Sequence, residues 1–218
     1  IAFVKSLRDE AEKHGVLFLY ESEVVNIVTD NHYVITAGNN IIDAHILINA
    51  AGLYADEISH MACGKTYAIY PWRGEYYEVK EMKRHLVERL VYPPPSLHQG
   101  FKGIHLSPRP DGKLFIGPNA RRVQSKNDYS CDKTPAAVFY KAVHRFLPSI
   151  KESDLAWAYA GIRAKNTDDN RDADYIIQID RNDPPLVNLI GIDSPGLTAA
   201  LAIAEYVEGL LNNHFRSP

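Results

Sequence analysis

The sequence is short of cysteine, of long apolar runs and of excess positive charge, and each shortage argues against a class of protein. Cys63 and Cys131 are the only cysteines among 218 residues, too few and too far apart for a disulfide framework or a zinc site. No apolar run has the length of a membrane-spanning helix. The 24 Lys and Arg residues against 27 Asp and Glu residues give a formal net charge of −3, which argues against a nucleic-acid partner. We therefore expect a cytoplasmic protein, with peripheral contact to a membrane left open.

The chain also lacks an initiator methionine and the layout of a signal peptide. Residues 1–15 have the pattern of the later half of an amphipathic helix that ends at Gly15. We expect from this pattern that the chain begins inside an element of a longer protein, although a processed terminus would look the same.

What the sequence does contain is an ordinary globular composition, 45% hydrophobic and 23% charged. Asp111-Gly112 predicts a hairpin turn. Thr134 is the expected N-cap of one helix, and Ser194 or Thr198 of another. Apolar spacing predicts helices at 1–15, 52–62, 134–146 and 198–211, and β-branched or aromatic runs predict strands at 16–20, 24–28, 33–36, 41–50, 72–79, 90–92, 103–107, 113–117, 156–163, 175–179 and 186–190.

This order of elements predicts an α/β (α+β) fold with two parts. Both chain ends alternate strands and helices, whereas the middle has the short strands and turns of an antiparallel sheet. We expect residues 1–69 and 150–218 to form one layered domain and residues 70–149 to form an inserted antiparallel-sheet domain.

Five segments, in this order, carry a resemblance to a known family: Ile46–Asp56, Pro71–Tyr77, Gly103–Asn119, Ala160–Arg163 and Gly191–Thr198. Together they resemble the D-amino-acid oxidase-like FAD-dependent oxidoreductases, and among these most of all the L-2-hydroxyglutarate dehydrogenase/oxidase branch. The resemblance implies a three-layer FAD-binding domain with an inserted substrate domain. It also implies oxidation of a 2-hydroxy acid by hydride transfer from Cα to flavin N5.

One departure from the family pattern is as informative as the agreement. The family holds the FAD pyrophosphate on a strand–Gly-x-Gly-x-x-Gly–helix unit, and none of the 13 glycines here has that spacing. The chain therefore resembles the C-terminal part of such an enzyme, and we expect it to bind FAD weakly or not at all by itself. Two alternatives stay open: a non-catalytic interaction module of the same fold, and a relative that oxidises an amine or glycerol 3-phosphate.

The expected cofactor contacts lie at strand–helix joints, where small residues leave backbone N–H groups facing a ligand. The residues from 191 to 198 form one such joint, and the resemblance assigns it to the flavin ring; Ala51 and Gly52 form another. Val24 and Val25 match the strand that meets the adenine. Ordinary packing explains small residues and valines as well. The predicted set is Val24, Val25, Ala51, Gly52, Gly191, Ser194, Pro195, Gly196, Leu197 and Thr198.

The expected catalytic residues are Arg163 and His105. Arg163 ends an apolar strand, so its guanidinium needs a carboxylate, either from a structural Asp or from the substrate. His105 has the chemistry of a base that removes the hydroxyl proton, although a histidine with a structural role fits the pattern too. Arg73, Tyr76, Tyr77 and Arg109 are further candidates for substrate binding.

No metal site is predicted, because the acidic run of residues 168–174 lacks the spacing of a calcium-binding loop. The expected partner is a small 2-hydroxy acid. The electron acceptor and the oligomeric state, including a homo-oligomer, are left open.

Overall fold

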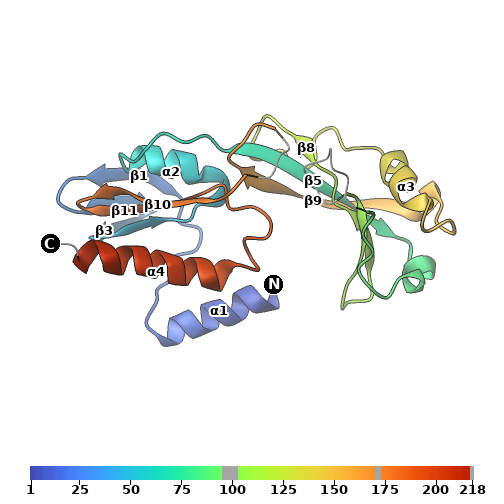
Figure 1. Cartoon of the computed structure of the whole chain (residues 1–218), viewed down its shortest axis with the longest axis horizontal. Coiled ribbons are helices and arrows are strands. Elements are labelled where there is room, and N and C mark those ends of the chain that lie inside the picture. Colours follow the sequence, from blue (N-terminus) through green and yellow to red (C-terminus); the bar gives the residue numbers. More distant parts are fainter. Residues whose placement is uncertain (95–102, 170–172, 217–218) are drawn as a thin grey trace.

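A computed structural model describes residues 1–94, 103–169 and 173–216, and these form two lobes joined by two long strands (Figure 1). The first lobe holds a three-stranded antiparallel sheet, β1 (Val24–Thr29), β2 (Tyr33–Ala37) and β3 (Asn40–Ala44). A second sheet in this lobe has the order β10 (Ile176–Asn182), β11 (Pro185–Ile190), β4 (Leu47–Asn49), and β11 runs parallel to β4.

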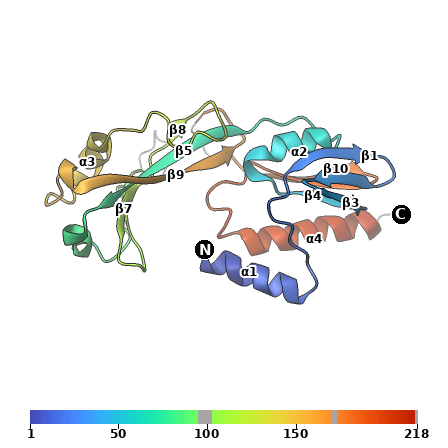
Figure 2. The same ribbon diagram turned by 180° about the vertical axis from the view of Figure 1, so that it is seen from behind.

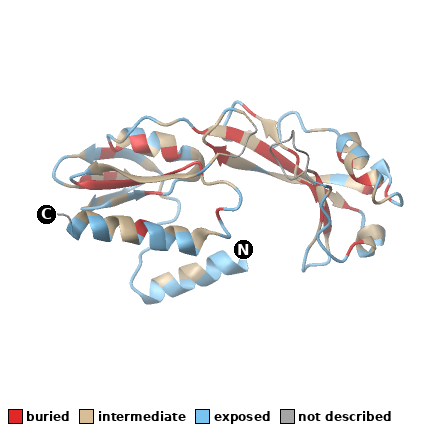
Figure 3. Ribbon diagram, in the orientation of Figure 1, coloured by how far each residue is buried: buried red, intermediate tan, exposed pale blue. Residues whose placement is uncertain are grey.

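Helices cover both sides of the first lobe. In Figures 1 and 2, α2 (Ala55–Met61) lies on one side of the sheets and α4 (Ala200–Arg216) on the other. The N-terminal helix α1 (Ala2–Lys13) lies alongside α4 and buries none of its residues. In Figure 3 the ribbon of α1 has no buried segment, α4 combines exposed, intermediate and buried segments, and the strands carry many of the buried ones.

The second lobe is a five-stranded antiparallel sheet built on β5 (Tyr70–Val79). One edge of β5 pairs with β7 (Leu114–Gly117) and with the short β8 (Arg121–Arg122), and β6 (His105–Pro108) continues beyond β7. The other edge pairs along its whole length with β9 (Leu155–Lys165). The helix α3 (Ala136–His144) covers one face of this sheet. Short 3-10 helices complete the chain at Gly52–Tyr54, Glu81–Leu86 and Glu152–Asp154.

The α/β (α+β) class with antiparallel sheets is confirmed. Most predicted strands are present, and residues 109–112 close the β6–β7 hairpin through a bond from the Gly112 N–H to the Arg109 carbonyl (3.0 Å). Residues 41–50, expected as an edge piece followed by a buried strand, form β3 and β4, whereas the strand expected at 90–92 contributes only a bridge between Val91 and Leu106. The domain boundary expected at residue 150 stays a prediction; β9, which follows it, lies in the sheet of β5.

Three local predictions were wrong. Residues 16–20 form no strand, because this run is exposed and has no strand beside it to pair with; the Val16 N–H bonds back to Ala11. Thr134 does not cap α3, since its hydroxyl donates to Glu75 and Pro135 occupies the N-cap position. The last helix begins at Ala200, and in the described structure neither Ser194 nor Thr198 makes a side-chain capping bond.

A buried polar cluster holds the mixed sheet of the first lobe together. The Asp180 carboxylate is fully buried and accepts hydrogen bonds from Tyr67, Asn188 and Gln178, each at 2.7 Å. Gln178 also donates to the Tyr67 hydroxyl at 2.8 Å. Burial alone raises the pKa of Asp180, but these donors together lower it below its ordinary value. Because β10, β11 and the segment before β5 all contribute, the cluster fixes how the first lobe meets the second.

The Tyr67 hydroxyl gives a testable pH dependence. Burial, and then its hydrogen bond to Asp180, raise the pKa of Tyr67 to about 12. The folded-state pKa exceeds the unfolded value near 10, so this contribution to stability is complete below about pH 10 and is lost as the pH rises toward 12. We expect the stability advantage of wild type over Tyr67→Phe to shrink by on the order of 2 kcal/mol across that window. Urea unfolding at each pH measures it, with the exposed Tyr129→Phe as control; an advantage that is constant with pH would contradict this account.

Candidate active site

Strand register places several predicted site residues on one face of the second sheet. Leu106, Ile116 and Tyr77 lie opposite one another across β6, β7 and β5, and all three pack on the α3 side. Because neighbouring side chains in a strand point to opposite faces, His105 and Tyr76 lie on the other side. We call this side the far face. It carries Trp72, Gly74, Tyr76, His105, Phe115, Gly117, Tyr159, Gly161 and Arg163.

Gly74 makes room for the Arg163 guanidinium on the far face. Gly74 and Gly161 lie directly opposite each other in β5 and β9, so neither strand projects a side chain at this level. A Cβ added to Gly74 would come within 2.9 Å of Nη2 and 3.0 Å of Nη1 of Arg163. The guanidinium therefore lies against the bare backbone of Gly74, the kind of close approach for which a strand interior uses glycine.

The Arg163 guanidinium has no carboxylate within 4.0 Å in the described structure. Its Nη1 and Nη2 both donate to the carbonyl of Asn119, each at 3.3 Å. Burial lowers the pKa of Arg163, and Tyr76 and Asp193 oppose this only in part. A partly desolvated cation held by long bonds to one carbonyl is suited to bind an anion, which would supply the missing charge and the stronger hydrogen bonds.

Asn119, which sequence reasoning did not single out as a functional residue, fixes that carbonyl in place. Its side-chain oxygen accepts the Glu75 N–H at 2.7 Å, and its Nδ2 donates to Glu75 at 2.8 Å and to Thr134 at 2.9 Å. Glu75 is fully buried; burial raises its pKa, but the bonds from Thr134 and Asn119 and the charge of Arg73 together lower it. The buried carboxylate thus stays ionised and holds Asn119 rigidly.

Two predicted substrate residues lie away from the far face. Arg73 is fully buried on the α3 side, where it pairs with Asp128 at 2.6 Å and approaches Glu75 at 3.7 Å. Tyr77 packs at 4.6 Å from the ring of Phe139 and donates its hydroxyl to the Thr134 carbonyl at 2.7 Å. Protein groups bind both side chains there, although the buried Nε of Arg73 has no hydrogen-bond partner among the described residues, and the substrate-binding role of both stays a prediction.

Aromatic rings form the remainder of the far face. Tyr76 stacks on Tyr159 with 4.7 Å between ring centroids, and Phe115 meets Tyr159 edge-on at 5.6 Å. Burial raises the pKa of Tyr76, so its hydroxyl stays protonated at neutral pH and is available as a donor. Arg109 reaches this cluster and donates a hydrogen bond to the Tyr159 hydroxyl.

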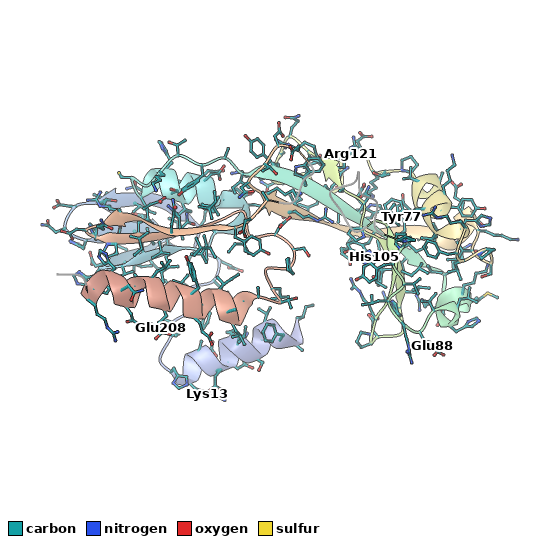
Figure 4. The ribbon with its side chains drawn as sticks, viewed as in Figure 1. Lys13, Tyr77, Glu88, His105, Arg121 and Glu208 are labelled. Atoms are coloured by element: carbon teal, nitrogen blue, oxygen red, sulfur yellow. The ribbon has the colours of Figure 1, made fainter. Side chains whose placement is uncertain are left out.

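His105 lies at the side of this cluster, two strands from Tyr76. Figure 4 places it in the same lobe as Tyr77. At ordinary strand spacing the Cα atoms of His105 and Tyr76 are roughly 10 Å apart, and Gly117 between them carries no side chain. The His105 ring stacks on Tyr92 at 4.3 Å, and its Nδ1 lies 3.1 Å from the Gly103 carbonyl. If Nδ1 carries the hydrogen, Nε2 is the basic nitrogen of the neutral ring.

The predicted cofactor joints meet at an apolar groove in the first lobe, about 750 Å³ in volume, between α4 and the sheet edge at β4. Gly52 and Gly196 both line it, with Ile46, Ile48, Ala200 and Ile203 among the apolar residues. Ala51, Gly191, Ser194, Pro195, Leu197 and Thr198 are chain neighbours of those two glycines. Figure 4 shows α4, marked by Glu208, in this lobe.

Val24 and Val25 lie apart from the groove, in β1. Val24 packs against the cluster around Tyr33, and Val25 is exposed. The structure thus brings together the two glycine-containing joints, but not the valines with them.

The joint from 191 to 198 adjoins the strand that carries Arg163. Gly191 has φ +73°, and a Cβ there would lie 2.7 Å from the side chain of Asn166, just beyond the end of β9. The N–H groups of Ser194 and Leu197 make no hydrogen bond in the described part of the chain, whereas Gly196, Thr198 and Ala199 bond within the turn. Backbone donors without partners and the absence of Cβ atoms fit one half of a flavin site, the half that offers N–H groups to the ring.

The glycine-containing joint of residues 191–198 thus lies beside the sheet that carries Arg163. Residues 1–210 match the family described as FAD dependent oxidoreductase (DAO), and the chain belongs to this family. The structure superposes with a TM-score of 0.78 and 30% identity on dithionite-reduced L-alpha-glycerophosphate oxidase from Mycoplasma pneumoniae with FAD bound, covering 93% of this chain and 53% of that one.

The curated relatives include both a glycerol 3-phosphate dehydrogenase and L-2-hydroxyglutarate dehydrogenases. The chain is 31% identical to a glycerol 3-phosphate dehydrogenase of Caloramator mitchellensis, over 97% of this chain and 43% of the relative. It is 28% identical to a mitochondrial L-2-hydroxyglutarate dehydrogenase of Caenorhabditis elegans, over 97% of this chain and 59% of the relative. The chain thus spans about half the length of the relatives it matches.

Two features of the described residues, their helices and their metal-ligating side chains, concern possible partners. None of their helices is long and apolar enough to cross a membrane. Nor do three or more of their His, Cys, Asp or Glu side chains gather where they could hold a metal ion. Cys63 and Cys131 are both free and exposed.

The glycine pair provides a test of how Arg163 is held. In Gly74→Ala the new methyl group would overlap the guanidinium, so we expect Arg163 to move and lose its bonds to the Asn119 carbonyl. Gly161→Ala is the matched control, because a Cβ there meets nothing within 4 Å. Crystal structures of both variants decide the matter: an Arg163 guanidinium in its wild-type place in Gly74→Ala would show that the glycine does not position it.

Proposed function

We propose that the chain is the substrate-binding part of an FAD-dependent oxidoreductase that oxidises a 2-hydroxy acid of the L-2-hydroxyglutarate kind. The observation that carries the proposal is Arg163, a partly buried guanidinium on a glycine platform with no carboxylate of its own in the described structure. Membership of the FAD-dependent family and the L-2-hydroxyglutarate dehydrogenases among the relatives support it.

In this proposal Arg163 binds the substrate carboxylate through two parallel hydrogen bonds. Such a pair fixes both the position and the rotation of the acid, which is most of what orienting Cα requires. Tyr76 is beside it with a protonated hydroxyl, available to donate to a substrate oxygen. When bound, FAD supplies a ring whose N5 accepts the hydride from Cα.

The proton on the substrate hydroxyl needs a base, and His105 is the candidate on the far face. In the tautomer whose Nδ1–H donates to the Gly103 carbonyl, Nε2 is the basic nitrogen that would take this proton. In a 2-hydroxy acid the hydroxyl is on the carbon bonded to the carboxylate, so the proposal requires Nε2 of His105 and the Arg163 guanidinium to reach the same end of the substrate from strands on either side of Tyr76. The rings of Tyr76, Tyr92 and Tyr159 border this part of the far face.

A second candidate substrate is glycerol 3-phosphate, favoured by the identity of 30–31% to glycerol 3-phosphate dehydrogenase and oxidase relatives. Its phosphate would take the place of the carboxylate at Arg163, and the roles of His105 and Tyr76 would stay the same. Anaerobic flavin reduction in the full-length protein distinguishes the two candidates. Bleaching by L-2-hydroxyglutarate supports the first and bleaching by glycerol 3-phosphate the second, while no bleaching by either would refute both.

Arg163→Ala tests the anion-binding role. Loss of a charge-assisted, two-bond contact raises KM for the substrate by on the order of 100-fold. The control is Arg145→Ala, an exposed arginine that follows α3 on the opposite side of the sheet. Steady-state kinetics of the full-length, FAD-loaded protein measure the effect, and equal KM values for wild type and Arg163→Ala would contradict the role.

His105→Asn tests the base. We expect a fall of 10²–10⁴-fold in the rate of flavin reduction, the usual contribution of a general base, with substrate binding little changed. Stopped-flow measurement under anaerobic conditions separates this rate from the KM effect of Arg163. A rate within about threefold of wild type would remove His105 from the mechanism.

A further inference from the structure

Arg109 is a second cation on the far face, held in a defined position. It closes the β6–β7 hairpin, where its N–H bonds to the Lys113 carbonyl at 2.8 Å. Its side chain then turns back over the sheet, so that Cζ lies 4.2 Å from the ring centroid of Phe115 and 5.1 Å from that of Tyr159. Its Nη2 donates to the Tyr159 hydroxyl. Two ring contacts and a hydrogen bond restrict an otherwise flexible side chain.

The charge of Arg109 has no acidic partner within 4.0 Å in the part of the chain that the structure describes. Four other arginines of this lobe do have one: Arg73 pairs with Asp128, Arg84 with Glu78, Arg121 with Asp132 and Arg122 with Asp168. Arg163, on the same face as Arg109, has none either. The far face thus carries two arginines whose remaining donors point to no carboxylate of the protein.

The stacked pair Tyr76 and Tyr159 lies between these two arginines. Arg163 lies over Gly74, one row of the sheet from Tyr76, and rows on one face are about 7 Å apart along a strand. Arg109 contacts Tyr159 from the other side. This separation suits a compact molecule with an anionic group at each end, lying across the tyrosine rings.

We propose that Arg109 binds a second anionic group, so that this site selects a substrate with negative charge at both ends over one whose far end is neutral. The inference rests on the proposed function for Arg163 and deepens it. The second group is a carboxylate or a phosphate, since a guanidinium binds either with paired hydrogen bonds. A neutral end would leave the Arg109 charge without a counterion, and this difference is the source of the selectivity.

Binding of unreactive analogues to the full-length, FAD-loaded protein tests the proposal without turnover. The probes are glutarate, with a carboxylate at both ends, butyrate, with one, and 3-phosphonopropionate, which replaces one carboxylate by a phosphonate. Calorimetry compares wild type with Arg109→Gln, Arg163→Gln and the control Arg145→Gln. We expect Arg109→Gln to lower the affinity for glutarate by at least tenfold and to change the affinity for butyrate by less than twofold. Arg163→Gln lowers the affinity for both.

Tyr159→Phe keeps the charge of Arg109 but removes the hydroxyl that accepts its hydrogen bond. We expect it to lower the affinity for glutarate by a smaller factor than Arg109→Gln does. Weakening of 3-phosphonopropionate by Arg109→Gln beyond that of glutarate identifies a phosphate as the preferred group, and the reverse order a carboxylate. Equal glutarate affinity in wild type and Arg109→Gln overturns the proposal, as does an equal loss for butyrate or no glutarate binding in wild type. The proposed function fails on a different result, the absence of flavin reduction.

Discussion

The site depends on one contact, the Arg163 guanidinium lying against the backbone of Gly74. The missing side chain at Gly74 leaves this space in the middle of paired strands, and a guanidinium without an acidic partner in the described structure is suited to bind an anion there. The cost of partly desolvating the cation is reduced by the Asn119 carbonyl but not removed by it. An anion that binds here supplies the negative charge that the described protein residues do not place beside Arg163.

The opposite side of the same strands shows the contrasting case. There Arg73 and Glu75 are fully buried; Asp128 pairs with Arg73, and Asn119 and Thr134 donate hydrogen bonds to Glu75. Removing one member of such a cluster leaves a buried group unpaired, so the cluster resists change and fixes the geometry of β5. Asn119 links the two sides, because its side chain belongs to the closed cluster while its carbonyl faces Arg163. The buried polar cluster on the α3 side thus positions the Asn119 carbonyl, which holds the Arg163 guanidinium on the far face.

The sequence predicted the fold class, most of the strands and the family, because these follow from hydrophobic pattern and motif order. It predicted Arg163, Tyr76, His105 and Arg109, which share the far face, but also Arg73 and Tyr77, which do not. Alternation along β5 already separates residues 73 and 77 from residue 76. The alternation does not tell which face of the sheet α3 covers, because that depends on contacts between residues distant in sequence. The interior glycine at 74 was the available signal for close approach, and Asn119 had none, because its role is exerted through a backbone carbonyl.

The central claim is that the far face binds an anionic substrate beside the flavin, and a crystal structure of the full-length protein with FAD and glutarate tests it most directly. The account predicts a glutarate carboxylate within hydrogen-bond distance of both Arg163 Nη atoms, with the flavin ring next to the turn from Gly191 to Thr198. Glutarate bound away from Arg163, or a flavin ring remote from that turn, would contradict it.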